Sequence, residues 1–275
     1  MPRGIALFVL LAMDRVPLPR VIGHRGSAAT APENTLAGFR RAAADGVPWV
    51  EFDVRLAADG VPVVIHDATL RRTAGLGGSI AERTSTELAR IDVGRRFGRA
   101  FADETIPTLA ETCAFLAALG LCANVEIKPA PAGGAAAARA VARTLDRSWP
   151  GTLPAPIVSS FDWSVLATLA AEAPHWPRGL LMRHPPRDWA GWARRLGVAS
   201  LHVGDGGLDR PTVAALKASD LPVLAYTVNR AARARRLFAW GVDAVFSDRP
   251  GALLRALGRK VVFSGSGSYI PGPRG

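Results

Sequence analysis

The chain has 275 residues, 49% of them hydrophobic, and carries a formal net charge of +11. This length suits one large α/β core, and the lack of a long low-complexity run excludes a disordered or fibrous protein. Only three of the basic residues are lysines; arginine suits phosphate recognition, although an Ala/Arg/Gly-rich composition also arises from a GC-rich genome. The charge favours a small anionic partner, and no basic-aromatic stripe indicates nucleic acid.

The two ends read as segments outside the main domain. Residues 5–13 form an apolar run that is too short to span a bilayer, so we expect no stable membrane insertion. No small-residue cleavage site follows this run, so residues 1–19 are predicted to be a leader of a cytoplasmic protein, with a secretory signal as the alternative. Residues 259–275 are predicted to be a flexible tail, which leaves 20–258 as the domain.

Short apolar runs alternate with helical stretches along the domain, which predicts parallel βα units. So many units favour an α/β fold of the TIM-type (β/α)8 barrel class over an open sheet. The candidate strands are 21–23, 49–54, 61–65, 122–127, 157–159, 179–182, 201–203, 223–228 and 244–246. The candidate helices are 35–44, 109–119, 134–145, 163–171, 189–196, 210–218, 230–240 and 250–257. The candidate strands number nine, one more than the barrel needs. Residues 67–107 show no alternation of strand-like and helical segments and are predicted to be a small insertion over one face of the barrel.

The first strand runs directly into His24, Arg25 and Gly26. A single histidine after a strand is commonly structural. Here, however, His24 can move a proton, Arg25 can hold an anion, and Gly26 allows the backbone to approach a ligand. Asn34 or Thr35 is a candidate cap for the helix that follows.

The second strand carries Glu51 and Asp53. Alternate residues of a strand share one face, so these two carboxylates point the same way. Buried together they are costly unless they bind a cation, and carboxylates favour hard ions such as Mg²⁺ or Ca²⁺. The alternative interpretation is a pair of solvated acids at the rim.

The third strand ends at His66. If Asp59 and Gly60 form a tight hairpin turn, residue 58 lies opposite 61 and residue 53 opposite 66. His66 would then share the face of Asp53. If the two strands are instead parallel neighbours, His66 still ends at the rim of the barrel.

The strand at 122–127 contributes Glu126, and Lys128 follows two residues later on the same face. Glu126 would be a third carboxylate for one ion, and Lys128 could balance the charge of a phosphate. Taken alone, this pair is equally well explained as an internal salt bridge. Together with the earlier residues it favours a metal-held phosphate, with histidines that transfer protons to and from its esters.

At this point the sequence closely resembles the glycerophosphodiester phosphodiesterase family over about residues 20–257. The matching stretches are HRGSAATAPENT at 24–35, VEFDVRLAADGVPVVIHDATLRRTAG at 50–75, IPTLAE at 106–111, VEIKP at 125–129, SSF at 159–161, AYTVN at 225–229 and GVDAVFSDRP at 241–250. The resemblance implies a TIM-type barrel and hydrolysis of glycerophosphodiesters to sn-glycerol 3-phosphate and an alcohol.

The resemblance also implies a role for individual residues. It implies His24 and His66 as the acid–base pair, and Glu51, Asp53 and Glu126 as ligands of one divalent cation, Mg²⁺ or Ca²⁺. Arg25 is implied as a phosphate contact, and Lys128 as a supporting cation at the phosphate-binding site. Many relatives have Trp where this chain has Tyr226, so the aromatic wall for the glycerol is kept but its shape is not. Phe161 is a candidate for a second wall, and both aromatic residues could equally belong to the core.

Three other functions were weighed against this one. A lysophospholipase D or another lipid phosphodiesterase would use the same site but would need a wide apolar groove. A catalytically inactive barrel would have lost one of the histidines or carboxylates, and none is missing. A nucleic-acid-binding role rests on net charge alone. The alcohol, the ion, the attacking group and the oligomeric state are left open.

Overall fold

The computed structural model describes residues 17–258 and 263–264, and its centre is a closed barrel of parallel strands. The barrel strands are β2 (Val21–His24), β3 (Trp49–Leu56), β5 (Cys122–Ile127), β6 (Ile157–Ser160), β7 (Arg178–Met182), β8 (Ser200–Gly204), β9 (Val223–Tyr226) and β10 (Ala244–Ser247). Each strand pairs in parallel with its neighbours, and β2 closes the ring by pairing with both β10 and β3. The predicted (β/α)8 barrel is therefore confirmed.

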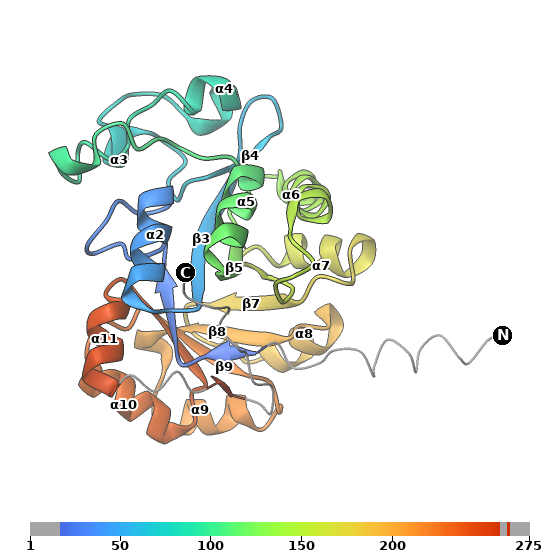
Figure 1. Cartoon of the computed structure of the whole chain (residues 1–275). Coiled ribbons are helices and arrows are strands. Elements are labelled where there is room, and N and C mark those ends of the chain that lie inside the picture. The colour runs from blue at the N-terminus through green and yellow to red at the C-terminus, as the bar shows by residue number, and fades with distance from the viewer. Residues whose placement is uncertain (1–16, 259–262, 265–275) are drawn as a thin grey trace.

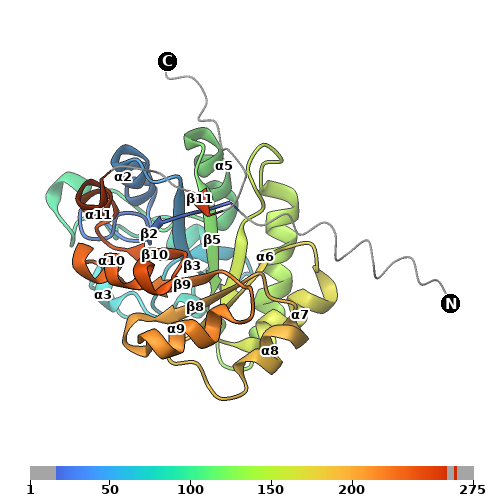
Figure 2. The same ribbon diagram turned by 90° about the horizontal axis from the view of Figure 1, so that it is seen from below.

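A ring of helices surrounds the barrel, as Figure 2 shows. They are α2 (Leu36–Asp45), α5 (Leu109–Leu119), α6 (Gly134–Ser148), α7 (Trp163–Glu172), α8 (Trp189–Leu196), α9 (Arg210–Lys217), α10 (Ala231–Trp240) and α11 (Pro250–Leu257). Side-chain caps start several of them. Thr35, not Asn34, caps α2 by accepting a hydrogen bond from the Gly38 N–H, and Thr108 caps α5 in a capping box with Glu111. These caps fix where each strand-to-helix loop ends.

Strand β4 (Pro62–Val64) is the surplus strand of the sequence analysis, and it pairs antiparallel with the end of β3. The predicted hairpin register is wrong by one residue, because Val54, rather than residue 55, lies opposite Val64. The turn is one residue longer than expected. The Ala57 N–H donates to the Val61 carbonyl oxygen, and Gly60 takes a φ of 75° that completes a three-residue loop. His66 therefore lies beyond the ladder rather than opposite residue 53.

The segment between β4 and α5 is the predicted insertion, and Figure 1 shows it set apart from the ring of helices. It contains α3 (Arg71–Ala74), η1 (Ile80–Glu82), α4 (Ser85–Leu88) and η2 (Arg99–Phe101). Its buried side chains form a small core with the outer residues of the hairpin. That core contains Ala57, Val63, Ile65, Leu70, Ile80, Leu88, Ile91, Val93 and Ile106. The insertion is thus anchored at the hairpin that leads to His66.

The barrel strands alternate between two environments. Val50, Phe52 and Val54 of β3 belong to the large apolar layer between barrel and helices. The intervening residues point into the barrel, where Trp49 joins a smaller apolar cluster at the amino-terminal end and Glu51 and Asp53 lie nearer the carboxyl end. The apolar cluster fills the amino-terminal end of the barrel, so the polar side chains lie together at the mouth formed by the carboxyl ends of the strands.

The described parts of the two end segments pair with each other. Strand β1 (Leu18–Pro19) lies antiparallel to β11 (Phe263–Ser264), and the Leu18 side chain is buried in the cluster below the barrel. Residues 1–16 of the predicted leader at 1–19 and most of the predicted tail at 259–275 lie outside the described residues, and the domain boundaries stay predictions. Among the described helices, none is long and apolar enough to cross a membrane. The two cysteines, Cys113 and Cys122, are buried and form no disulfide.

Candidate active site

A tight loop after β2 places His24 and Arg25 over the mouth of the barrel. Arg25 has a φ of 51°, and Gly26 follows with a φ of 88°. A Cβ on Gly26 would lie 2.6 Å from the backbone of Gly38, so only glycine fits between this loop and α2. The loop turns the Arg25 N–H onto Glu51 Oε2 at 2.9 Å. The backbone of the His-Arg-Gly motif is therefore itself part of the site.

Three carboxylates from two neighbouring strands meet inside the barrel. Glu51 and Asp53 of β3 are 3% and 1% exposed, and Glu126 of β5, which lies opposite Asp53 in the register, is 8% exposed. One oxygen from each lies within 4.8 Å of the other two. Glu51 Oε1 is buried and accepts no hydrogen bond from any part of the chain that the structure describes. The shared face deduced from strand parity is confirmed, and the alternative of solvated acids is excluded.

The carboxylates differ in charge state because their surroundings differ. Burial together with the charge of Asp53 raises the pKa of Glu51 to about 8. Burial and the charge of Asp53 also raise the pKa of Glu126. Burial would raise the pKa of Asp53 as well, but Arg25 and Lys128 hold it below its ordinary value. Without further positive charge, the three groups therefore do not all ionise at neutral pH.

Two basic side chains border the carboxylates. Arg25 Nε lies 3.1 Å from Asp53 Oδ2, and Lys128 Nζ lies 3.4 Å from Asp53 Oδ1 and 2.5 Å from Glu126 Oε1. Both are largely shielded from solvent, with 18% and 16% of their side chains exposed. Because each cation faces the same small volume as the carboxylates, an anion entering there would meet two positive groups at once.

His24 is held by a carboxylate from the last strand of the barrel. Its Nδ1 lies 2.6 Å from Oδ1 of Asp248, and its Nε2 lies 3.8 Å from Oε2 of Glu51. Asn229 donates to the other oxygen of Asp248 at 2.7 Å and so orients that carboxylate. Burial would lower the pKa of His24, yet Glu51 and Asp248 together raise it above its ordinary value. An acceptor at Nδ1 leaves Nε2 as the atom that exchanges a proton with a ligand.

His66 stands in a second pair of the same kind. Its Nδ1 lies 2.6 Å from Asp67 Oδ1, and Arg72 of α3 donates to Asp67 Oδ2 at 2.7 Å. Arg72 also donates two hydrogen bonds to Glu33, at 2.6 and 2.7 Å, and Glu33 accepts from Arg25 at 3.0 Å. Burial lowers the pKa of His66 below its ordinary value. The surroundings therefore shift the pKa values of the two histidines in opposite directions.

The aromatic residues of the motifs stand together at the rim. The rings of Phe161 and Tyr226 meet edge to face with centroids 5.8 Å apart, and Lys128 Nζ lies 5.8 Å from the Phe161 centroid. The Tyr226 hydroxyl donates to the Met182 carbonyl oxygen at 2.9 Å, and Phe161 is 41% exposed. Tyr226 is thus anchored in the barrel wall, while Phe161 leaves an open aromatic face next to Lys128.

Three residues that contact this cluster were not predicted from the sequence to belong to the site. Asp248 and Glu33 were quoted within motifs but given no role, and Asn34 was considered only as a helix cap. Asn34 instead donates to Asp53 Oδ2 at 2.9 Å and accepts from the Asp53 N–H, with a φ of 56°. Asp248 could have been predicted from the sequence, because it lies at the carboxyl end of β10 as His24 lies at the carboxyl end of β2.

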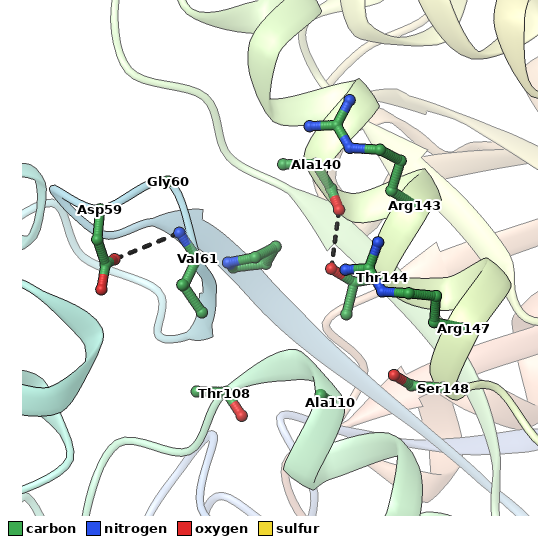
Figure 3. Close-up of a pocket in the computed structure, with 11 residues that line it drawn as sticks. Asp59, Gly60, Val61, Thr108, Ala110, Ala140, Arg143, Thr144, Arg147 and Ser148 are labelled. Carbon is green, nitrogen blue, oxygen red and sulfur yellow. Dashed lines mark hydrogen bonds between the residues drawn. The ribbon is translucent and has the colours of Figure 1, made fainter.

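A separate pocket of about 270 Å³ lies on the outer side of the barrel. The turn of the β3–β4 hairpin faces α5 and α6 there, with Arg143 and Arg147 of α6 along one wall (Figure 3). None of the predicted site residues lines it. The pocket is therefore distinct from the cluster at the mouth of the barrel.

Comparisons with known proteins agree with this geometry. The family model described as Glycerophosphoryl diester phosphodiesterase family matches residues 24–252. A glycerophosphodiester phosphodiesterase of Caldanaerobacter subterraneus subsp. tengcongensis is 32% identical over 85% of this chain and 96% of its own length.

Solved structures show the same likeness. An Oleispira antarctica phosphodiesterase in complex with the product sn-glycerol-3-phosphate is 38% identical, with a TM-score of 0.85 over 87% of this chain and 97% of that one. A glycerophosphodiester phosphodiesterase of Thermotoga maritima is 27% identical, with a TM-score of 0.68 over 86% of this chain and 97% of that one.

Proposed function

Because this chain belongs to the glycerophosphoryl diester phosphodiesterase family and is a glycerophosphodiester phosphodiesterase, we propose that His24 and His66 are its acid–base pair. We further propose that Glu51, Asp53 and Glu126 hold a divalent cation on which the activity depends. The products would be sn-glycerol 3-phosphate and the alcohol of the diester.

Two histidine–carboxylate pairs beside one carboxylate cluster support this proposal. Each pair has an Nδ1-to-oxygen distance of 2.6 Å, so each ring keeps its Nε2 for the ligand. The raised pKa of His24 makes it the readier proton donor, and the lowered pKa of His66 makes it the readier proton acceptor. Phosphodiester cleavage needs one group of each kind, a base for the attacking oxygen and an acid for the leaving alcohol. That requirement is the same for attack by water or by the substrate's own glycerol hydroxyl.

The donor set fits a hard divalent cation such as Mg²⁺ or Ca²⁺. Three oxygens lie within 4.8 Å of one another, and buried Glu51 Oε1 accepts no hydrogen bond within the described chain. Carboxylates with raised pKa values are groups from which a cation would displace protons. A bound cation would supply positive charge that neutralises a phosphate and polarises its P–O bonds.

Arg25 and Lys128 are proposed to bind the phosphate, and Phe161 and Tyr226 to form the glycerol wall. The two cations are fixed by Asp53, so they are already oriented before the anion arrives. The exposed ring of Phe161, with Tyr226 edge to face against it and Lys128 beside it, offers an apolar surface against which the glycerol carbons could pack. The relative from Oleispira antarctica, whose structure contains sn-glycerol-3-phosphate, supports a ligand of this class.

Single substitutions of the histidines test the proposal. His24→Ala and His66→Ala should each lower turnover of glycerophosphocholine by about 10²–10⁴-fold, because each removes one proton-transfer group. His175→Ala is the matched control, since His175 forms an exposed pair with Asp146 at 2.8 Å on the helical surface. Near-normal turnover in either site variant would exclude the acid–base assignment.

The cation is tested separately. Excess chelator should abolish turnover, and added Mg²⁺ or Ca²⁺ should restore it. Glu51→Gln should raise the concentration of ion that is needed for half-maximal activity. Full activity in excess chelator would exclude the metal role while leaving the histidine assignment intact.

A further inference from the structure

A cavity of about 540 Å³ lies at the rim of the barrel between the β8–α9 loop and the first turns of α10. It adjoins the proposed active site through one residue. Asn229, which lines the cavity, donates to Asp248 at 2.7 Å, and Asp248 in turn lies 2.6 Å from His24. Asn229 thus places the cavity beside the His24–Asp248 pair.

The cavity has an excess of positive charge. Its lining includes Arg230, Arg233, Arg236 and one acid, Asp205. Arg233 is neutralised, because its Nε lies 2.6 Å from Asp205 Oδ1 and its terminal nitrogen donates to the carbonyl oxygens of Asp205 and Leu208. Arg230 and Arg236 are exposed, and neither forms an ion pair or a hydrogen bond through its side chain within the part of the chain that the structure describes. The guanidinium groups of Arg230 and Arg236 are thus available to bind a ligand.

We propose that this cavity binds an anionic group on the alcohol portion of the substrate. The inference rests on the proposed function, since it assigns the second arm of the same phosphodiester. A guanidinium fork binds carboxylate or phosphate oxygens in pairs, and two such forks in one cavity match an extra phosphate better than a cationic or apolar headgroup. The favoured substrates are therefore glycerophosphodiesters whose alcohol carries a further negative charge.

The same lining argues against the lipid alternative at this position. A lysophospholipid would place a hydrocarbon chain beside the site, and that chain would need an apolar groove. Along this side of the mouth, the chain instead presents Asp205, Asn229 and three arginines. Burying hydrocarbon against charged groups would cost their hydration without any compensating contact.

A matched pair of substrates tests the inference: glycerophosphoinositol and glycerophosphoinositol 4-phosphate differ only in one phosphate on the alcohol. The wild-type enzyme should show the higher kcat/KM for the 4-phosphate. Arg230→Gln and Arg236→Gln should each lower kcat/KM for the 4-phosphate by about two- to fivefold, mainly through KM, as expected for an exposed ion pair. Each variant should keep its kcat/KM for glycerophosphoinositol within about twofold of wild type.

Two controls isolate the local effect. Arg147→Gln removes the same charge from the pocket of Figure 3, which does not contact the site, and should change neither substrate's kcat/KM. Raising the salt to about 0.5 M should shrink the preference of the wild type toward that of the double variant Arg230→Gln/Arg236→Gln, because screening weakens exposed pairs.

Distinct failures separate the two proposals. An unchanged preference in the double variant, or equal losses on both substrates, overturns the anion subsite and leaves the phosphodiesterase function standing. Failure of the wild-type enzyme to cleave glycerophosphocholine as well as both inositol substrates, with the cation supplied, overturns both.

Discussion

Replacing Asp248 by Asn tests how far His24 depends on the last strand of the barrel. Asp248 lies 2.6 Å from His24 Nδ1 and is itself fixed by Asn229. In Asp248→Asn, the carboxylate that stabilises a protonated His24 is lost, and an amide that donates to Nδ1 would hold the imidazole neutral with its proton on Nε2. The shape of the side chain is otherwise preserved.

The expected loss follows from the bond that is removed. A hydrogen bond to a charged group contributes about 1.5–3 kcal/mol, so kcat/KM for glycerophosphocholine should fall by about 10- to 150-fold if the bond acts in the transition state. The assay is steady-state turnover at saturating cation, with thermal unfolding measured in parallel.

A control lies at the other end of the same strand. Asp243 precedes β10, pairs with Lys217 at 2.7 Å and accepts from the Val223 N–H at 2.8 Å. Asp243→Asn should lower the unfolding temperature and leave turnover within about twofold, because a partly exposed ion pair contributes little beyond stability. Turnover of Asp248→Asn within twofold of wild type, or equal loss in both variants, would refute the positioning role of Asp248.

Three other changes have defined outcomes. Arg72→Gln removes the cation that joins Asp67 to Glu33 and should lower kcat/KM about three- to tenfold without unfolding the barrel, as steady-state assays and circular dichroism would show. Gly26→Ala should lower the free energy of unfolding by about 1–3 kcal/mol in chemical denaturation, because residue 26 has a φ of 88° and the new methyl group would clash with the backbone of Gly38. Gly46→Ala is the control: residue 46 has a similar φ of 84° but open space around it, so the loss should be smaller. Burial alone would raise the pKa of Asp67, but hydrogen bonds from Arg72 and His66 lower it from 3.8 to about 2, so the ionised carboxylate stabilises the fold fully above pH 4 and loses that effect as the pH falls to 2. The difference in unfolding temperature between wild type and Asp67→Asn should therefore shrink between pH 4 and pH 2.

Strand parity gave the carboxylate cluster correctly because it depends on local geometry alone. Glu51 and Asp53 had to share a face once their segment was a strand, and the structure buries both inside the barrel. The hairpin register depended on the length of one turn, and there the sequence misled. The loop contains Ala58 as well as Asp59 and Gly60, and the Asp59 carboxylate accepts from the backbone N–H and the hydroxyl of Ser85 in the insertion. No pattern near residue 60 announces that distant contact.

The missed partners have a common cause. Asp248 is 224 positions from His24 and meets it only because β10 pairs with β2. Asn34 is a good cap by composition, but Asp53 competes for its side chain and Thr35 takes the cap. The polar residues at strand ends can be recognised from the sequence. Which of them contact one another is decided by closure of the barrel, which the local sequence does not show.

That closure also determines when the enzyme can become active. The first barrel strand, β2, finds its partner β10 only after more than two hundred further residues have left the ribosome. Until then β2 has an open edge, and contacts over such a separation form slowly because the intervening chain must first be ordered. The nascent chain would therefore carry a complete set of carboxylates and both histidines without an oriented His24. Catalytic competence should arise late and all at once, so pulse-labelled synthesis should show no turnover before Asp248 has emerged.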